Sequence, residues 1–440
     1  MADRYWVGGT ATWDGTALLK WALTSGGVGG QAVPTAADDV YFDAASGAVT
    51  ITLSGARTCL SFNSTGFTGT LTGTGTLAVS ANAIYGAGAT FTNTGTWTFN
   101  ATSGTQQITS NSKTLDFPIT QNGVGGTVQL QDNLTTGASR TFTLTNGALD
   151  LNSKILSTGL FSSNNSNVRS IAFGTGSITL TGNAATIWAG NTAAATVGLT
   201  VTGTPVVNCT YSGSTGTRTI SGGHLNSTSE ANTISFNVSA GSDTVTLNGS
   251  HTFRNINFTG FSGTLTNNGK YIYGNWTSSS GMTISDGTGV TFFASTSGTK
   301  TITNNGTTFG GPITFDGVGG TWSFVDALTQ STTRAFTITN GTVQLKSGVT
   351  SSVGSFATSS TNQKFLQSTT SGTQATLSQV TGIVSTGYLT IKDINATGGA
   401  TFNAYTVNSN VNAGNNLGWD FFAQLGKTIF TRRKEKRVLI

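Results

Sequence analysis

Residues 118–153 read PITQNGVGGTVQLQDNLTTGASRTFTLTNGALDLNS, and the chain contains this stretch twice. The second copy, residues 312–347, reads PITFDGVGGTWSFVDALTQSTTRAFTITNGTVQLKS, and 19 of the 36 aligned positions are identical. The offset is 312 − 118 = 194 residues, and it also relates shorter matches upstream without any insertion. A long internal repeat of this kind indicates a fold built from repeated units.

The repeated stretch has the period of β-strands. Its apolar residues alternate with polar ones, which places one set of side chains on one face of a strand. The first copy contains Phe142, Leu144, Leu149 and Leu151 at these positions. Asn146 and Gly147 separate the two halves and return as Asn340 and Gly341. Because Asn-Gly readily adopts positive φ, we expect the same sharp turn in both copies.

Composition favours an all-β fold with rows of stacked polar residues. Charged residues make up 8% of the 440 residues, whereas about 25% is usual, and there are 60 Gly. We predict a β-helix or solenoid; tandem β-sandwich domains are the alternative that a 194-residue period also permits. With ~20–25 residues per coil, the solenoid forms a rod on the order of 80 Å long.

The net charge of +5 lies entirely at the C-terminal end of the chain. Without the tail, 15 cations and 15 anions remain, so the body gives no support to nucleic-acid binding. Two interpretations of the tail stay open: a docking segment for an acidic partner surface, or a solvated basic tail. Its cations are Lys427, Arg432, Arg433, Lys434, Lys436 and Arg437.

The chain divides into four parts on this reading. Residues 1–46 are rich in Trp and form an N-terminal cap or attachment segment, since the first coil of a solenoid needs a cover. Residues 47–240 and 241–421 are two β repeat units, of which the second ends in a closing cap. Residues 422–440 are the basic tail. Two alternatives apply to the cap: its aromatic residues form a sugar-binding platform, or Asp38, Asp39 and Asp43 share a calcium ion.

Two motifs resemble β-rich adhesin-like proteins of tailed bacteriophages and bacterial surfaces. The first is YWVGGTATWDGT followed by VPTAADDVYFDAASG, within residues 5–47. The second is YLTIKDINATGGATFNAYTVNSNVNAGNNLGWDF, residues 388–421. The segment MADRYWVGG has no apolar signal region, so we expect synthesis in the host cytoplasm without a signal peptide, which favours the phage branch.

The resemblance implies a non-enzymatic structural protein of a tailed-phage virion, exposed as a fibre-like or spike-like appendage. Its expected partners are other virion proteins, a host cell-surface glycan or protein, and further copies of itself, with a trimer expected by analogy with phage fibres. A membrane span is not expected, because the sequence has no apolar run long enough to cross a bilayer as a helix. The alternatives are a capsid decoration or head fibre protein, a bacterial surface adhesin, and a polysaccharide depolymerase.

The residues that enzymes commonly use are scarce in this chain. Cys59 and Cys209 are the only cysteines and are expected to be buried small side chains, and there are only two histidines. Neither a nucleophile elbow nor a zinc motif is present, so no cofactor or catalytic residue is expected. Asp243 and Asp286 are the unmatched carboxylates that a depolymerase would use as a pair.

One charged pair recurs in both copies of the repeat. Asp132 and Arg140 return as Asp326 and Arg334. We expect each aspartate to pair with the arginine of its own copy and to brace a turn.

Overall fold

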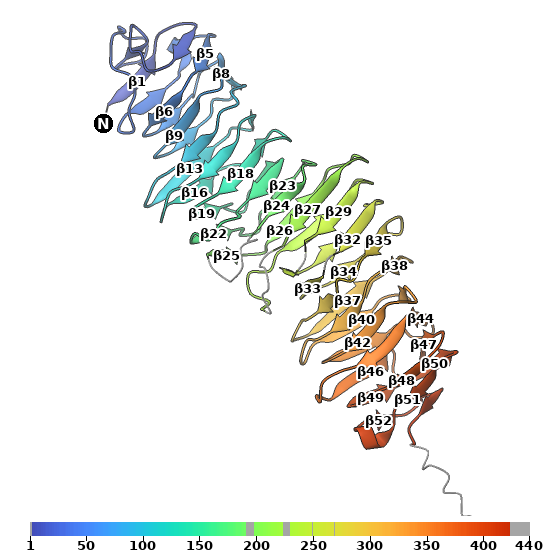
Figure 1. Cartoon of the computed structure of the whole chain (residues 1–440). Helices are drawn as coiled ribbons and strands as arrows, with labels where there is room; N and C mark the ends of the chain where they lie inside the picture. Colours follow the sequence, from blue (N-terminus) through green and yellow to red (C-terminus); the bar gives the residue numbers. More distant parts are fainter. Residues whose placement is uncertain (1, 191–197, 223–228, 249, 268, 423–440) are drawn as a thin grey trace, which may run out of the picture.

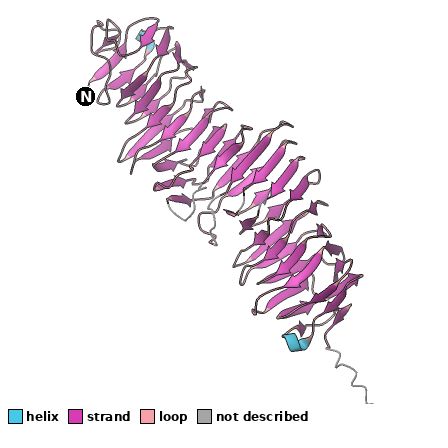
Figure 2. Cartoon of the chain, viewed as in Figure 1, coloured by secondary structure: helices cyan, strands magenta, loops and turns pink. Residues whose placement is uncertain are grey.

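The chain forms an elongated parallel β-solenoid of about 16 coils (Figure 1). This computed structural model describes residues 2–190, 198–222, 229–248, 250–267 and 269–422. Apart from two short 3-10 helices, η1 (Ala44–Ser46) and η2 (Thr406–Asn408), the regular elements described are strands (Figure 2). The predicted β-solenoid is confirmed. The tandem-sandwich alternative is wrong, because successive coils pair their strands in parallel along one continuous rod.

Each coil passes over three faces of the rod in the same order. Face 1 consists of β3 (Trp21–Ala22), β1 (Asp3–Trp6), β4 (Asp39–Tyr41), β7 (Phe62–Asn63), β10 (Ala83–Ile84), β13 (Thr105–Thr109), β16 (Thr127–Leu130), β19 (Gly147–Asp150), β22 (Arg169–Ala172), β25 (Leu199–Thr202), β30 (His251–Phe253), β33 (Lys270–Ile272), β36 (Thr291–Phe293), β39 (Ile313–Phe315), β42 (Ala335–Ile338), β45 (Ser355–Thr358), β48 (Ile383–Ser385), β51 (Thr401–Asn403) and β53 (Trp419–Asp420).

Face 2 consists of β2 (Ala11–Trp13), β5 (Thr50–Leu53), β8 (Thr70–Gly73), β11 (Thr90–Phe91), β14 (Thr114–Leu115), β17 (Leu134–Thr136), β20 (Ile155–Thr158), β23 (Ser177–Leu180), β26 (Val206–Cys209), β28 (Ser235–Val238), β31 (Ile256–Asn257), β34 (Trp276–Thr277), β37 (Thr299–Thr303), β40 (Thr321–Phe324), β43 (Thr342–Leu345), β46 (Lys364–Ser368), β49 (Leu389–Lys392) and β52 (Val411–Asn412).

Face 3 consists of β6 (Ala56–Cys59), β9 (Thr76–Val79), β12 (Trp97–Phe99), β15 (Ile119–Gln121), β18 (Thr141–Leu144), β21 (Leu160–Ser162), β24 (Thr186–Ala189), β27 (Thr217–Ser221), β29 (Thr244–Leu247), β32 (Thr264–Asn267), β35 (Thr283–Asp286), β38 (Thr308–Phe309), β41 (Thr329–Gln330), β44 (Thr350–Val353), β47 (Ala375–Gln379) and β50 (Ile394–Gly398).

Alternation along each strand builds the core. In β18, Phe142 and Leu144 are buried, whereas Thr141 and Thr143 face outward and are partly exposed. The parallel register then places buried aromatic residues of successive coils next to one another. Phe142 pairs with Phe161, whose ring stacks on that of Trp188 at 4.5 Å. Each buried aromatic ring contributes about 1.5–3 kcal/mol by leaving water. Outward positions form matching polar columns, such as Thr120 over Thr143.

The Asn-Gly turns are corners of the solenoid. Gly147 has φ of 69° and Gly341 has φ of 75°, so both copies use the positive φ predicted for them. A Cβ atom at Gly147 would lie 2.2 Å from the carbonyl oxygen of Gly123 in the previous coil. Glycine is therefore required here both for its backbone conformation and for the close approach of two corners.

The second copy of the repeat is rotated by one face relative to the first. Strands β13 to β21 correspond to β37 to β45, yet β13 lies on face 1 and β37 on face 2. Between β27 and β28 the chain crosses face 1 without a strand in its described residues, although Val201 on β25 donates its backbone N–H to Asn232 there. The repeat offset therefore spans a whole number of coils plus one further face. The sheets on faces 2 and 3 continue across residues 240 and 241, through the pairs β28–β31 and β27–β29.

Residues 14–32, which follow the face 2 strand β2, lie at the N-terminal end of the rod and include β3. β3 pairs antiparallel with β1, whereas the other strand pairs among the described residues are parallel. The rings of Trp6, Trp13 and Trp21 are fully buried, and the Trp21 ring meets those of Trp6 and Trp13 edge to face at 5.1 and 5.3 Å. These residues therefore form a cover for the first coil.

Candidate functional site

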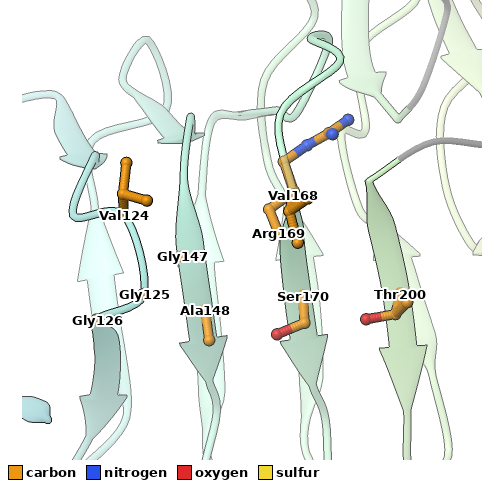
Figure 3. A pocket seen from close by; sticks show the side chains of 9 residues that line it. All are labelled: Val124, Gly125, Gly126, Gly147, Ala148, Val168, Arg169, Ser170 and Thr200. Carbon is orange, nitrogen blue, oxygen red and sulfur yellow. The ribbon is translucent and has the colours of Figure 1, made fainter. Parts of the chain in front are cut away.

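A shallow groove runs along face 1, across β16, β19, β22 and β25 (Figure 3). Its floor is a column of small outward side chains, Ala148, Ser170 and Thr200, which the parallel register places side by side. Its rim carries Val124 and Val168, which are 66% and 80% exposed. Gly125, Gly126 and Gly147 also line it.

Arg169 lies at the end of this groove but turns its charge inward. Its guanidinium group donates to the Ser163 hydroxyl at 2.5 Å, to the Asn167 carbonyl at 2.6 Å and to the Ser163 carbonyl. The residue is 1% exposed, and burial lowers its pKa. Arg169 therefore fixes the corner before β22, and the groove itself offers hydroxyl groups and apolar edges. Such a surface suits a neutral, extended ligand, and its lining contains no carboxylate, imidazole or thiol among the described residues.

Asp243, one of the two depolymerase candidates, is committed to a buried ion pair. Its two carboxylate oxygens accept from Nε and Nη2 of Arg218, each at 2.7 Å, and both side chains are fully buried. Tyr211 also packs on the guanidinium group at 5.2 Å. The side chain of Asp286 falls outside the described residues. Asp243 is therefore a structural residue.

The expected pairing of Asp132 with Arg140 is wrong. Arg140 instead forms an ion pair with Asp116 at 2.9 Å, and Arg334 donates to the carbonyl oxygen of Gly310, which replaces Asp116 in the second copy. Asp132 accepts the backbone N–H groups of two successive corner residues, at 2.8 and 2.6 Å.

Asp326 makes the same two bonds at the same distances in the second copy. The aspartate common to both copies therefore accepts backbone N–H groups of the previous corner. The arginine donates to a different oxygen of the neighbouring coil in each copy: the Asp116 carboxylate in the first and the Gly310 carbonyl in the second.

The residues named for the two alternative sites of the cap are engaged in the fold. The three tryptophans are fully buried and therefore form no exposed platform for a sugar, whereas Tyr5 and Tyr41 are partly exposed and stack on each other at 4.6 Å. Asp38 binds Thr35 and the N–H of Ala2, Asp39 accepts from Ser61, and Asp43 caps η1. In the described part of the chain, no group of three or more His, Cys, Asp or Glu residues is arranged to hold a metal ion.

Both cysteines are buried and unpaired, as expected. Burial raises the pKa of the Cys209 thiol to about 12 and that of the Cys59 thiol further. At neutral pH the two thiols are therefore protonated and poorly nucleophilic.

The two ends of the rod present apolar side chains to solvent. At the N-terminal end, Leu18, Leu19 and Val28 are exposed on the outer surface of the cap. At the C-terminal end, four exposed side chains lie in the last coil and the turn before it: Val407, Val411, Leu417 and Phe422. The six tail cations from Lys427 to Arg437 lie outside the described residues.

Sequence reasoning found the corners but missed the groove. Asn146, Gly147, Asn340 and Gly341 are where the Asn-Gly pattern placed them. The groove forms only because particular strands of successive coils lie side by side. The one part of its lining that stands out in the sequence is the GVGG corner at residues 123–126. Ser170 and Thr200 are far apart in the sequence, and only the register of the coils brings them together.

Comparisons of the chain with protein-family models, with curated proteins and with solved structures give no match. None of the helices in the described residues is long and apolar enough to cross a membrane.

Proposed function

We propose that this chain is a non-enzymatic structural protein of a tailed-phage virion, where it stands on the particle as a rod-like appendage. The observation that carries the proposal is the form of the molecule. It is one continuous solenoid with columns of polar side chains along its faces, a Trp-rich cap at its N-terminal end and exposed apolar side chains at its C-terminal end. The two motifs that resemble adhesin-like phage proteins lie at these two ends, one in the cap and one in the last coils. Of the two carboxylates that a depolymerase would use as a pair, Asp243 is fully buried in an ion pair with Arg218.

Attachment to the particle is proposed at the C-terminal end. The body before the tail contains equal numbers of cations and anions, so the cationic tail dominates any long-range electrostatic attraction. The groove on face 1 is the proposed contact with the host surface, because a neutral groove with hydroxyl groups and apolar rims suits a glycan.

The test is incorporation into purified particles. Peptides of the chain are expected in gradient-purified virions at constant stoichiometry to the major capsid protein. A chain ending at Phe422 is expected to keep its circular dichroism spectrum and to be absent from particles. The matched control replaces Arg432, Arg433 and Lys434 with glutamine in the full-length chain, which removes charge without shortening the tail.

Exposed ion pairs are weak, about 0.2–1 kcal/mol each, so attachment is expected to loosen as salt rises. Normal incorporation of the chain ending at Phe422 would move the anchor to the N-terminal patch of Leu18, Leu19 and Val28. Finding the chain in infected-cell lysate but never in particles would end the virion proposal.

A further inference from the structure

A second hollow, here called the corner hollow, lies near the C-terminal end of the rod. It is formed where three successive coils turn from face 1 to face 2, between β45 and β46, between β48 and β49, and between β51 and β52. Its volume is about 610 Å³, which is within the range of sites that hold a small molecule. Most of its lining residues carry a hydroxyl group. Among the described residues, the side chains of Thr361, Ser385 and Ser409 have no hydrogen-bond partner, so their hydroxyl groups are available to a ligand.

The backbone of these three corners is unlike that of the same corner in earlier coils. In three earlier coils, glycines supply the positive φ that the corner uses: Gly298, Gly319 and Gly341. In the corner hollow, Ser360, Tyr388 and Ser409 have φ of 67°, 54° and 59°. A side chain is strained in this conformation, and one as large as that of Tyr388 is rare there. The chain therefore places side chains in the hollow at positions where glycine would be less strained, and such strain gathers at binding sites.

A buried cation lies beneath the corner hollow. Lys364, the first residue of β46, is fully buried. Its ammonium group donates to the carbonyl oxygens of Ser360, Gly387 and Tyr388 at 3.3, 3.2 and 3.4 Å, and Nζ lies 5.7 Å from the centroid of the Tyr388 ring. The ion pairs among the described residues do not include Lys364. Burial lowers its pKa, which reflects the cost of a charge that dipoles hold in place but no carboxylate neutralises.

We propose that the corner hollow binds a carboxylated sugar. The ring hydroxyl groups of the sugar would exchange hydrogen bonds with Thr361, Ser385 and Ser409. The Tyr388 ring, which is partly exposed, offers an apolar surface with a polar edge. The carboxylate of the sugar would compensate the charge of Lys364, which a neutral sugar cannot do. This inference concerns binding by the chain alone, so it stands or falls independently of the virion proposal and of the groove on face 1.

The test is saturation-transfer NMR of the full-length chain with glucuronate and, separately, with glucose. Glucuronate is expected to bind about tenfold more tightly than glucose, because the two sugars differ in the carboxylate that faces Lys364. Lys364→Met keeps the length of the buried side chain and removes its charge, so it is expected to abolish this preference. Equal affinity for the two sugars, or an unchanged preference in Lys364→Met, would overturn the proposal. So would displacement of glucuronate by an equal concentration of acetate, which has the charge without the ring.

A pair of substitutions on one strand provides the matched control. Ser385 and Ile383 both lie on β48 and face outward, but only Ser385 lines the corner hollow. Ser385→Trp fills the hollow and is expected to reduce glucuronate binding at least tenfold. Ile383→Trp adds a ring of the same size to a side chain that is already 74% exposed, and it is expected to leave binding unchanged. Melting temperatures of both variants check that the fold is kept. Undiminished binding by a folded Ser385→Trp, or equal losses in the two variants, would contradict a site in this hollow.

Discussion

At the scale of single residues, this fold depends on close contacts between consecutive coils. The corners lie on one another at a spacing that excludes a Cβ atom at Gly147, and Gly341 occupies the equivalent corner in the second copy. Charged side chains that point inward are held by specific oxygens, as Arg169 and Arg218 are. The sequence pattern predicted the glycines correctly, because positive φ is a local property. It mispaired Asp132 with Arg140, because their true partners come from the neighbouring coil.

Gly147→Ala is expected to destabilise the chain more than Gly104→Ala does. Both glycines have φ near 70°, so both substitutions cost about 1–2 kcal/mol in backbone strain. At Gly104 a Cβ atom meets open space, whereas at Gly147 it meets the Gly123 carbonyl oxygen at 2.2 Å. Thermal unfolding of both variants gives the difference. Equal melting temperatures would show that the corners separate easily.

Asp243→Ala is expected to cost about 3–5 kcal/mol of folding free energy, because it leaves the buried Arg218 charge without its partner. Replacing both residues, Arg218→Met with Asp243→Leu, is expected to cost less than the single change. Denaturant unfolding measures both variants. If the double variant costs the sum of two separate losses, the two groups act independently and the ion pair does not explain their burial.

At the scale of elements, strands and corners are interchangeable among the three faces. The repeat places the same strand on face 1 in one copy and on face 2 in the other, and Asp132 and Asp326 still bind their corners alike. On each face, the strands alternate inward and outward side chains in the same way. A strand and the corner that follows it therefore fit on any of the three faces. The sequence therefore predicted the strands and the repeat length, but not the rotation, which arises because the described residues between β27 and β28 form no strand on face 1.

Asp38 is expected to make the N-terminal cap sensitive to acid. Burial opposes its charge, but hydrogen bonds from Thr35 and Ala2 and the nearby Arg4 outweigh that cost and lower its pKa. A lowered folded-state pKa stabilises the fold above the unfolded value of about 3.9, and this stabilisation is lost as the pH falls toward the folded value.

The measurement is the difference in melting temperature between the natural chain and Asp38→Asn. We expect the largest difference above about pH 4 and a shrinking one below it. A difference that stays constant down to strongly acidic pH would mean that the charge of Asp38 contributes nothing.

At the scale of the whole molecule, the chain is a rod with two unlike ends. About sixteen coils at ~4.8 Å make it roughly 80 Å long. Its N-terminal end is closed by its own residues, and its C-terminal end leads into the basic tail. A rod with one closed end and one charged, apolar end is suited to standing on a larger assembly.

The most direct test of this account is to locate both ends of the rod on purified particles. Gold labels are placed at the cap loop near Val28 and at the turn near Gly372, which lies close to the C-terminal end. The account predicts that the Val28 label stands farther from the particle surface than the Gly372 label, by most of the roughly 80 Å length. Labels at equal distances, the reverse order, or no label on particles would contradict it.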